Sequence, residues 1–426
     1  MIAFVSFGLL GLLALSIPVG VVLFLLAFGI DWFFSAFPLS RGLGQLMWSS
    51  SNSATLVAIP FFVLVGEILV RSGVAERTYA ALDKWVSWMP GGLIHANIAT
   101  ATMFSATSGS SVATSATVAT VAMPQAERLG YDPRLFAGSI AAGGTLGIMI
   151  PPSINLIIYG FLTETSIPQL FLAGLVPGLL LALSFMVVSA LLCWRFPSLG
   201  GPSRRSTWGE KVASLSRLLP ILALFVVIVG SIYAGLATPT EAAALGVAMA
   251  LAIAAANGGL SLTMIGASLR GTVRITAMIM LVVLGASFLN FVLAAAGLGR
   301  ALQTGLDGLG LDPLGTLLVI VALYIVLGFF IETLSLMVAT IPIVAPVVFG
   351  LGYDKVWFGI LLIVLVEMAL ITPPVGLNLY VVQGARRSGR LTEVMVGCIP
   401  YVLAMLAMAA LLIAVPGIAL WLPGSL

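Results

Sequence analysis

The chain has 426 residues, of which 61% are hydrophobic and only 8% are charged. Soluble domains carry charge on about a quarter of their residues, so this composition excludes an ordinary soluble protein and predicts an integral membrane protein. The formal net charge of +3 comes from loop residues and does not indicate a nucleic-acid partner. The two cysteines, Cys193 and Cys398, lack the spacing of a metal site or a disulfide framework.

The apolar runs predict an all-α protein with nine membrane crossings of about 20 residues each. Two further apolar stretches, 93–124 and 314–350, are interrupted near their middle by small or polar residues, which predicts re-entrant hairpins. The opening run is too long for a signal-peptide core and is interpreted as a span. The predicted spans lie near 2–28, 55–70, 136–166, 169–194, 218–236, 239–257, 273–295, 354–386 and 393–420.

Lys and Arg gather in loops that the positive-inside rule assigns to the cytoplasm. With these loops on one side, the spans alternate without contradiction, the N-terminus is cytoplasmic and the C-terminus is outside. The first hairpin then enters from the cytoplasm and the second from the periplasm. The basic residues of these loops are Arg71, Arg77, Lys84, Arg128, Arg134, Arg195, Arg204, Arg205, Lys211, Arg217, Arg270, Arg274, Arg386, Arg387 and Arg390.

Two short motifs recur about half a chain length apart. Val112-Ala113-Thr114 returns as Val338-Ala339-Thr340, and the double proline Pro151-Pro152 returns as Pro373-Pro374. Equivalent elements are separated by an odd number of spans, so the two halves point in opposite directions. The sequence therefore predicts an inverted repeat with broken transmembrane helices.

This repeat divides the chain into three parts. Each repeat also contains a moderately polar helical stretch, 75–88 in the first and 298–309 in the second, which is either an ordinary loop helix or an interfacial arm. The predicted parts are a first repeat over 1–194 with hairpin 93–124 and broken helix 136–166, a cytoplasmic loop over 195–217, and a linker span plus second repeat over 218–426 with hairpin 314–350 and broken helix 354–386.

The centre of the first hairpin, Ser105 to Ser111, is rich in hydroxyl groups. Unpaired backbone groups at membrane depth cost several kcal/mol each, so a helix break there indicates a use. Hydroxyl and carbonyl oxygens suit Na⁺, and the N-terminus of a half-helix attracts an anion. The alternative is that small hydroxylated residues only let helices pack closely.

The centre of the second hairpin, 328–335, contains Glu332. A carboxylate inside an apolar stretch is costly and marks a functional candidate. Glu332 serves either an ion, the substrate or the start of the second hairpin arm. Glu67 and Glu367 lie within spans and are candidates for pairing with polar groups across helices.

The double prolines interrupt two predicted spans and expose backbone carbonyls there. Asn155 and Asn378 follow the two breaks at equivalent places and supply amides. In one interpretation of these breaks, the carbonyls and amides face the hairpin tips. In the other, each break is only a kink in a packing helix.

Other motifs point to structure rather than chemistry. Thr238-Pro239-Thr240-Glu241 is typical of a helix-capping box, and His95 is interpreted as a helix-end residue. The chain contains no Gly-x-x-x-x-Gly-Lys-[Ser/Thr], His-Glu-x-x-His or Gly-x-Ser-x-Gly. The sequence thus predicts no ATP-driven step, no catalytic residues and no organic cofactor.

Several of these motifs together resemble the large membrane subunit of tripartite ATP-independent periplasmic (TRAP) transporters. The resemblance covers nearly the whole chain and rests on Ser105 to Ser111, Gly143 to Gly147 running into Pro151-Pro152-Ser153, Tyr233-Ala234-Gly235, Thr238 to Ala243, and Thr372 to Asn378. It implies an elevator-type carrier in the bacterial inner membrane that imports small organic acids by Na⁺ symport. It also implies two partners, a periplasmic substrate-binding protein and a small four-helix membrane subunit.

The family's sodium sites lie where hairpin tips meet broken helices. Two alternatives remain: a self-sufficient Na⁺/dicarboxylate elevator carrier, and a membrane-embedded enzyme or scaffold that uses Glu332 and the serines. The predicted substrate contacts are Ser108, Gly109, Ser110, Glu332, Thr333, Ser335, Asn155 and Asn378, and the predicted Na⁺ contacts are Ser105, Thr107, Ser108, Gly144, Gly147, Pro151, Gly328, Thr333, Thr372, Pro373 and Gly376.

Overall fold

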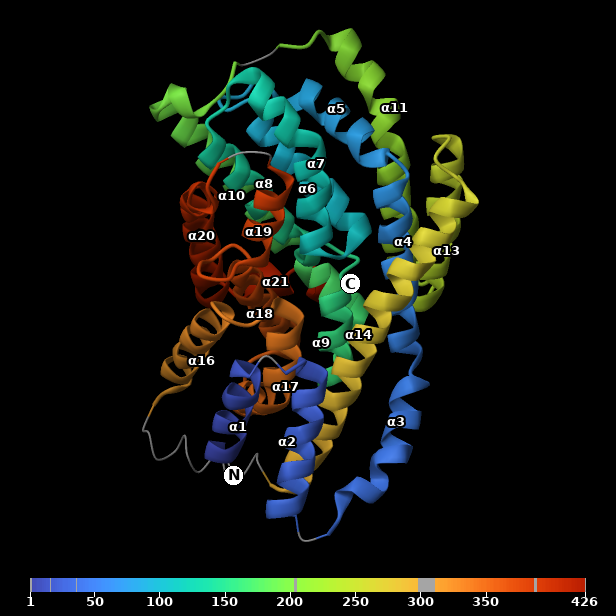
Figure 1. The fold of residues 1–426 in the computed structure, drawn as a ribbon, viewed down its shortest axis with the longest axis vertical. Coiled ribbons are helices and arrows are strands. Elements are labelled where there is room, and N and C mark those ends of the chain that lie inside the picture. The colour runs from blue at the N-terminus through green and yellow to red at the C-terminus, as the bar shows by residue number, and fades with distance from the viewer. Residues whose placement is uncertain are drawn as a thin grey trace.

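The computed structural model describes residues 2–15, 17–35, 37–202, 205–297, 311–386 and 389–425. Within these residues every regular element is a helix, which confirms the predicted all-α class. Figure 1 shows an elongated bundle in which the helices within residues 74–149 lie in the upper part, whereas those within residues 2–51 and 313–350 lie in the lower part. Seven of the described helices are long and apolar enough to cross a membrane, or up to eight if the bent pair α8 and α9 is one span.

The helices follow one another in a nearly repeated order. The N-terminal part contains α1 (Ile2–Ala14), α2 (Val19–Phe34), α3 (Leu43–Ser51), α4 (Ala54–Arg71) and α5 (Val74–Val86). The first hairpin and broken helix are α6 (Leu93–Ser108), α7 (Ser111–Leu129), α8 (Pro133–Met149) and α9 (Ile154–Thr163), followed by α10 (Ile167–Arg195). A linker contains α11 (Trp208–Phe225), α12 (Ser231–Tyr233) and α13 (Pro239–Ala256). The second half contains α14 (Leu262–Ala295), α16 (Pro313–Gly328), α17 (Thr333–Gly350), α18 (Lys355–Ala369), α19 (Leu377–Ala385), α20 (Leu391–Ala414) and α21 (Gly417–Leu420).

The two hairpins approach the middle of the molecule from opposite ends, as the inverted repeat predicts. Figure 1 shows α6 and α7 in the upper half and α16 and α17 in the lower half. Both predicted broken helices are present, because α8 and α9 are separated at residues 150–153 and α18 and α19 at residues 370–376. The axes of α8 and α9 differ by 42°.

The predicted single span over 2–28 is wrong, because this run folds into two helices, α1 and α2. The ring of Phe4 lies 5.8 Å from that of Phe33 and 5.5 Å from that of Phe34, measured between centroids, so the pair is antiparallel. Pro18 lies directly before α2. Proline disfavours helix in the residue before it, so an apolar run that is long enough to span can still turn back.

The predicted loop over 195–217 is too long, because about half of helix α11 lies within it. Helix α11 already begins at Trp208, where Thr207 and Glu210 form a capping box. A capped start satisfies the free N–H groups of the first turn, so the helix extends beyond the apolar run. The predicted helix at 75–88 is present as α5, whereas the stretch 298–309 lies outside the described residues.

Two smaller predictions are confirmed. Thr238 and Glu241 form the expected capping box at the start of α13. His95 lies in the first turn of α6, and its Nε2 is 2.7 Å from the carbonyl oxygen of Pro90.

The core is formed by the first arms of the broken helices, α8 and α18. Every residue from Leu135 to Met149 and from Val356 to Ala369 is buried. Glycines bring α8 against α20, because a Cβ on Gly138 would collide with the backbone of Gly397. Such backbone contact between helices is the usual way to gain packing energy in a membrane.

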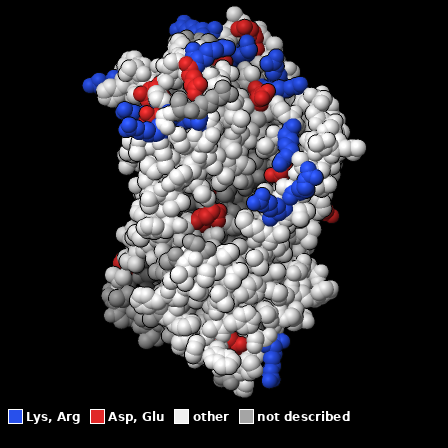
Figure 2. Space-filling model, in the orientation of Figure 1, with Lys and Arg blue, Asp and Glu red and all other residues white. Residues whose placement is uncertain are grey.

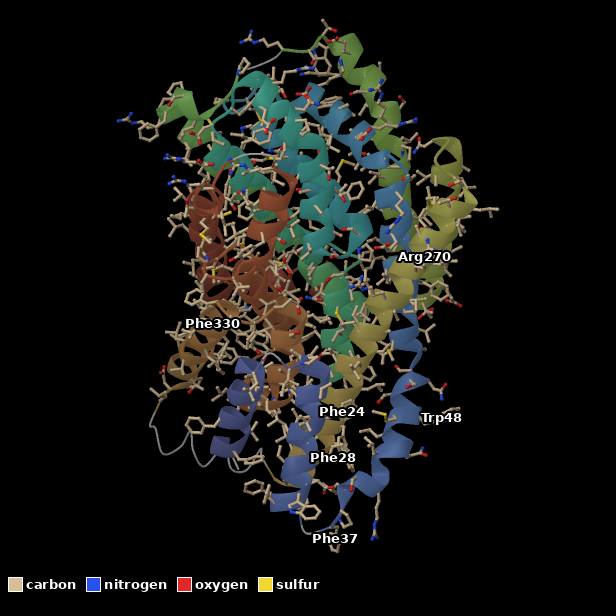
Figure 3. The ribbon with its side chains drawn as sticks, in the orientation of Figure 1. Phe24, Phe28, Phe37, Trp48, Arg270 and Phe330 are labelled. Carbon is tan, nitrogen blue, oxygen red and sulfur yellow. The ribbon has the colours of Figure 1, made fainter. Side chains whose placement is uncertain are left out.

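A second layer lies beside this core and contains α2, α4, α13 and α14. Helix α14 runs diagonally along α2 and α4 in Figure 1. Phe24 and Phe28 of α2, labelled in Figure 3, pack on Phe288 of α14 with centroid distances of 6.2 and 5.1 Å.

Charged side chains are unevenly distributed along the long axis. Figure 2 shows most Lys, Arg, Asp and Glu side chains at the upper end and a largely uncharged surface below. The N-terminus lies at the opposite, lower end in Figure 1.

Candidate substrate and ion site

The tip of the first hairpin lies between α6 and α7. Gly109 adopts the left-handed conformation with φ of 57°, which glycine tolerates best, and Ser110 then caps α7 by accepting from the N–H of Ala113 at 3.4 Å. A Cβ on Gly109 would lie 3.2 Å from the carbonyl oxygen of Pro152. The first tip therefore contacts the break between α8 and α9.

The tip of the second hairpin lies between α16 and α17. Glu332 caps α17, because its carboxylate accepts from the N–H groups of Leu334 at 3.1 Å and Ser335 at 3.0 Å. The N–H of Val375 donates to the carbonyl oxygen of Phe329 at 3.4 Å. The second tip thus contacts the break between α18 and α19, and the helix-start role of Glu332 is present.

Glycines in α8 let the start of α7 approach it closely. A Cβ on Gly144 would collide with Ser115 Oγ, and a Cβ on Gly147 would lie 2.9 Å from the Cα of Ser111. Backbone carbonyls and hydroxyls of α7 are therefore held against the helix that leads into the first proline break.

A cavity of about 140 Å³ lies where these elements meet. This is larger than the roughly 10–15 Å³ that one water needs. Six predicted substrate contacts line it: Ser108, Gly109, Ser110, Asn155, Glu332 and Thr333. The opposite wall comes from α4 and α14 and was not predicted; it consists of Val63, Gly66, Glu67, Val70, Ile275, Met278 and Ile279.

Two predicted substrate contacts do not line this cavity. Asn378 is buried and donates through Nδ2 to the carbonyl oxygen of Ala141 at 3.1 Å. Ser335 contributes its backbone N–H to Glu332. The tertiary structure thus separates Asn155 from Asn378, although the two follow equivalent proline breaks.

The predicted Na⁺ contacts surround the two junctions between tips and breaks. Three of their hydroxyls already donate to backbone carbonyls: Ser105 to Ala101 at 2.7 Å, Thr333 to Val366 at 3.3 Å, and Thr372 to Met368 at 2.6 Å. Their oxygen lone pairs remain available to a cation. Pro151, Pro373 and Gly376 lie in the breaks, Gly328 faces the methyl group of Ala369, and the side chain of Thr107 lies outside the described residues.

A contact between the two halves was missed in the sequence. Ser111 of the first hairpin donates to Oε2 of Glu367 on α18. Glu367 is buried, and its Oε1 has no partner among the described residues. Glu367 stood out in the sequence as an acid within an apolar run. No local pattern could identify its partner Ser111, which is 256 positions away.

Two hairpins whose tips meet two broken helices around one cavity are typical of a membrane transport protein. The structure of the Alcanivorax borkumensis YdaH transporter has the same fold, with a TM-score of 0.69 at 14% identity, over 95% of this chain and 99% of that one. The chain belongs to the family of the tripartite ATP-independent periplasmic transporter, DctM component, whose model matches residues 6–418.

Curated relatives agree with this family over almost their full length. The C4-dicarboxylate TRAP transporter large permease protein DctM of Pseudomonas aeruginosa is 35% identical over 91% of this chain and 90% of its own. The sialic acid TRAP transporter large permease protein SiaM of Vibrio cholerae is 34% identical over 98% and 97%. The ectoine TRAP transporter large permease protein TeaC of Halomonas elongata is 30% identical over 97% and 97%.

Family membership confirms the resemblance found in the sequence. The chain is a multi-pass protein of the bacterial inner membrane and the large permease of a TRAP transporter. Membership in a transporter family implies transport rather than enzymatic activity.

Proposed function

We propose that this chain imports a small organic anion together with Na⁺ through the cavity between the hairpin tips. The observation that carries this proposal is the convergence of both tips and Asn155 on one cavity whose other wall is formed by α4 and α14. The two walls belong to different layers of the fold, so an elevator-type movement of the hairpins past α4 and α14 would carry the cavity with it.

The first hairpin supplies hydrogen-bond donors for a carboxylate. The N-terminus of α7 lines the cavity at Ser111, Val112 and Ala113, and Ser110 caps it with a neutral hydroxyl. Nδ2 of Asn155 is buried and has no partner among the described residues. An amide donor and the positive end of a helix dipole both favour a negatively charged group.

Oxygen atoms near the same tips suit Na⁺. Ser108 Oγ lies 2.7 Å from Thr114 Oγ1, and Oγ of Ser115 is buried without a partner among the described residues. The described residues hold no group of three His, Cys, Asp or Glu side chains that could bind a metal ion. Hydroxyl, carbonyl and single carboxylate oxygens are the ligands that hard cations prefer.

The remaining parts of the proposal concern partners. A periplasmic binding protein delivers the substrate, and a small four-helix membrane subunit covers part of the exposed apolar surface of α11 and α13. Leu219 of α11 is 64% exposed, and Leu245 of α13 is 49% exposed. Support comes from the family, because the relatives are named as large permease proteins of TRAP transporters, a name that implies further subunits.

We further propose that the charged end of the molecule faces the cytoplasm, following the positive-inside rule. Because α1 and α2 form an antiparallel pair instead of one span, the N-terminus then lies on the periplasmic side. This reverses the orientation expected from the sequence. A cysteine added ahead of Ile2 should react with a membrane-impermeant maleimide in intact cells if this orientation is right.

Uptake into proteoliposomes tests the function. The chain is reconstituted with its small subunit and binding protein, and uptake of labelled succinate, sialic acid or ectoine is measured with Na⁺ or K⁺ outside. We expect uptake of one of these probes only with Na⁺ and the binding protein present. Undiminished uptake in K⁺ would contradict Na⁺ coupling, and undiminished uptake without the binding protein would favour the self-sufficient carrier.

A further inference from the structure

Two unpaired arginines lie beside the cavity on α14. Arg270 and Arg274 are both exposed and stand one helical turn apart. Figure 3 labels Arg270 on α14, and Figure 2 shows basic side chains on this flank of the molecule, next to the hollow in the middle of the view. Neither guanidinium has an ion-pair partner in the described parts of the chain.

Neither acid of the cavity lining is paired with these arginines. A Cβ on Gly271 would collide with the carboxylate of Glu67, so α14 packs directly on that side chain. Glu67 binds Arg71 one turn further along α4, and that pair carries no net charge. The other acid, Glu332, accepts two N–H groups at the start of α17.

The position of these arginines connects them to the cavity. Arg270, Arg274 and Met278 are four residues apart, so they form one stripe along α14. Met278 lines the cavity and is 55% exposed. The stripe therefore leads from a positive rim into the space between the hairpin tips.

We propose that Arg270 and Arg274 form an outer anion-binding site at the mouth of the cavity. The inference rests on the proposed function, because the anion it assigns to the site is the carboxylate of the transported substrate, held before or after it occupies the hairpin tips. Uncompensated charges on a membrane helix are costly and tend to mark substrate pathways. Positive charges beside a cleft also raise the local concentration of anions and their association rates.

The same guanidinium chemistry binds a lipid phosphate. The stripe favours the substrate over a lipid as the ligand, because Met278, its third member, lines the cavity. A lipid headgroup would bind at the surface without a connection to the cavity. The experiment therefore compares both sources.

A cysteine at Met278 measures the local potential without requiring transport. M278C is prepared in the complete transporter, where the natural cysteines Cys193 and Cys398 are both buried, and its modification rates by anionic MTSES and cationic MTSET are compared. We expect the MTSES to MTSET ratio to fall about fivefold when R270Q and R274Q are combined. The matched control is R217Q, which removes an exposed arginine of α11 that does not line the cavity.

Three outcomes decide the inference. An unchanged ratio in the double variant, or an equal fall in R217Q, would overturn it. Protection of M278C by phosphatidylglycerol nanodiscs but not by the transported probe would assign the site to lipid and also overturn it. If M278C does not react, uptake decides: the double variant should raise the apparent KM about fivefold at similar kcat, and an unchanged KM would contradict the proposal.

This readout separates the inference from the proposed function. Loss of Na⁺ dependence would overturn the proposed coupling, but it would leave the charge-dependent labelling of M278C in place. Conversely, Na⁺-driven uptake that is insensitive to R270Q and R274Q would keep the function and remove the outer site.

Discussion

The two hairpin tips share one architecture but differ in charge. In the first, Ser110 caps α7 with a neutral hydroxyl, whereas in the second, Glu332 caps α17 with a carboxylate that accepts two N–H groups. The positive end of α7 is therefore left open to an external anion, while that of α17 is already neutralised from within the chain. An inverted repeat can thus place two equivalent helix N-termini at one cavity, of which one can attract an anion and the other is already neutralised.

The junctions behind the tips differ as well. A Cβ on Gly147 would meet the backbone of Ser110 and Ser111, whereas a Cβ on Gly328 would meet the methyl group of Ala369 at 2.6 Å. The first junction is a contact with backbone atoms, which no substitution of the partner residue can relieve, whereas the methyl group at the second junction can be removed by exchanging Ala369 for glycine. Added volume can therefore be compensated at the second junction but not at the first.

The largest effect is expected when volume is added at these junctions. G147A and G328A should each lower uptake about a hundredfold, because overpacking costs about 1–3 kcal/mol. A second substitution, A369G, should restore uptake to G328A, because it removes the methyl group that the new side chain meets. The measurement is initial uptake rate per folded transporter, with G209A as control because a Cβ there meets nothing within 4 Å. Failure of A369G to restore uptake to G328A would remove this difference between the halves.

A smaller but more specific effect is expected from substitutions of the two capping residues, Glu332 and Ser110. E332Q keeps an acceptor for α17 but loses its charge, so we expect about tenfold weaker Na⁺ activation of uptake. S110A removes only a neutral cap, which costs about 1 kcal/mol of stability, and it should leave the Na⁺ dependence unchanged. Both are measured as uptake rate against Na⁺ concentration. Na⁺ dependence that changes in S110A and not in E332Q would reverse the assignment of the two tips.

The two asparagines should separate substrate binding from stability. N155A removes a donor that lines the cavity and should raise the apparent KM by about tenfold or more, since hydrogen bonds to charged groups contribute about 1.5–3 kcal/mol. N378A breaks the bond to the carbonyl oxygen of Ala141 and should lower the free energy of unfolding by about 1–2 kcal/mol without changing KM. A raised KM in N378A alone would show that the cavity has been placed in the wrong half.

The smallest effect concerns the contact that joins the halves. S111A leaves the buried Glu367 without its hydrogen-bond donor, and E367Q keeps a neutral acceptor for Ser111. In a double-mutant cycle on thermal unfolding of the complex, we expect a coupling energy of about 1 kcal/mol. Additive effects would mean that the two side chains do not act together.

Local patterns predicted most helices because hydrophobicity, helix caps and prolines act within a few residues. Such local patterns predicted the interruptions of both hairpins, both proline breaks, and the capping box of Thr238 and Glu241. The run over 2–28 was misjudged because its hydrophobicity is nearly uniform, and only the packing of Phe4 on Phe33 shows that it turns back.

The candidate site was predicted in part for the same reason. Serines, glycines and Glu332 stand out at helix breaks, so their sequence neighbourhood identified them. The wall from α4 and α14 consists mainly of apolar residues such as Val63 and Ile279, which look like any lipid-facing or core residue until the helices are packed.

By itself the sequence determined the membrane class and the two interrupted hairpins, because composition and short-range backbone preferences suffice for both, and the resemblance of its motifs identified the family. Only the tertiary structure decided that Ser111 meets Glu367, that Asn155 lines the cavity while Asn378 does not, and that Ile275 and Met278 of α14 form part of the cavity wall. These relations depend on which helix faces pack together. Within a membrane, the sequence of a uniformly apolar helix gives little indication of which helices pack against it.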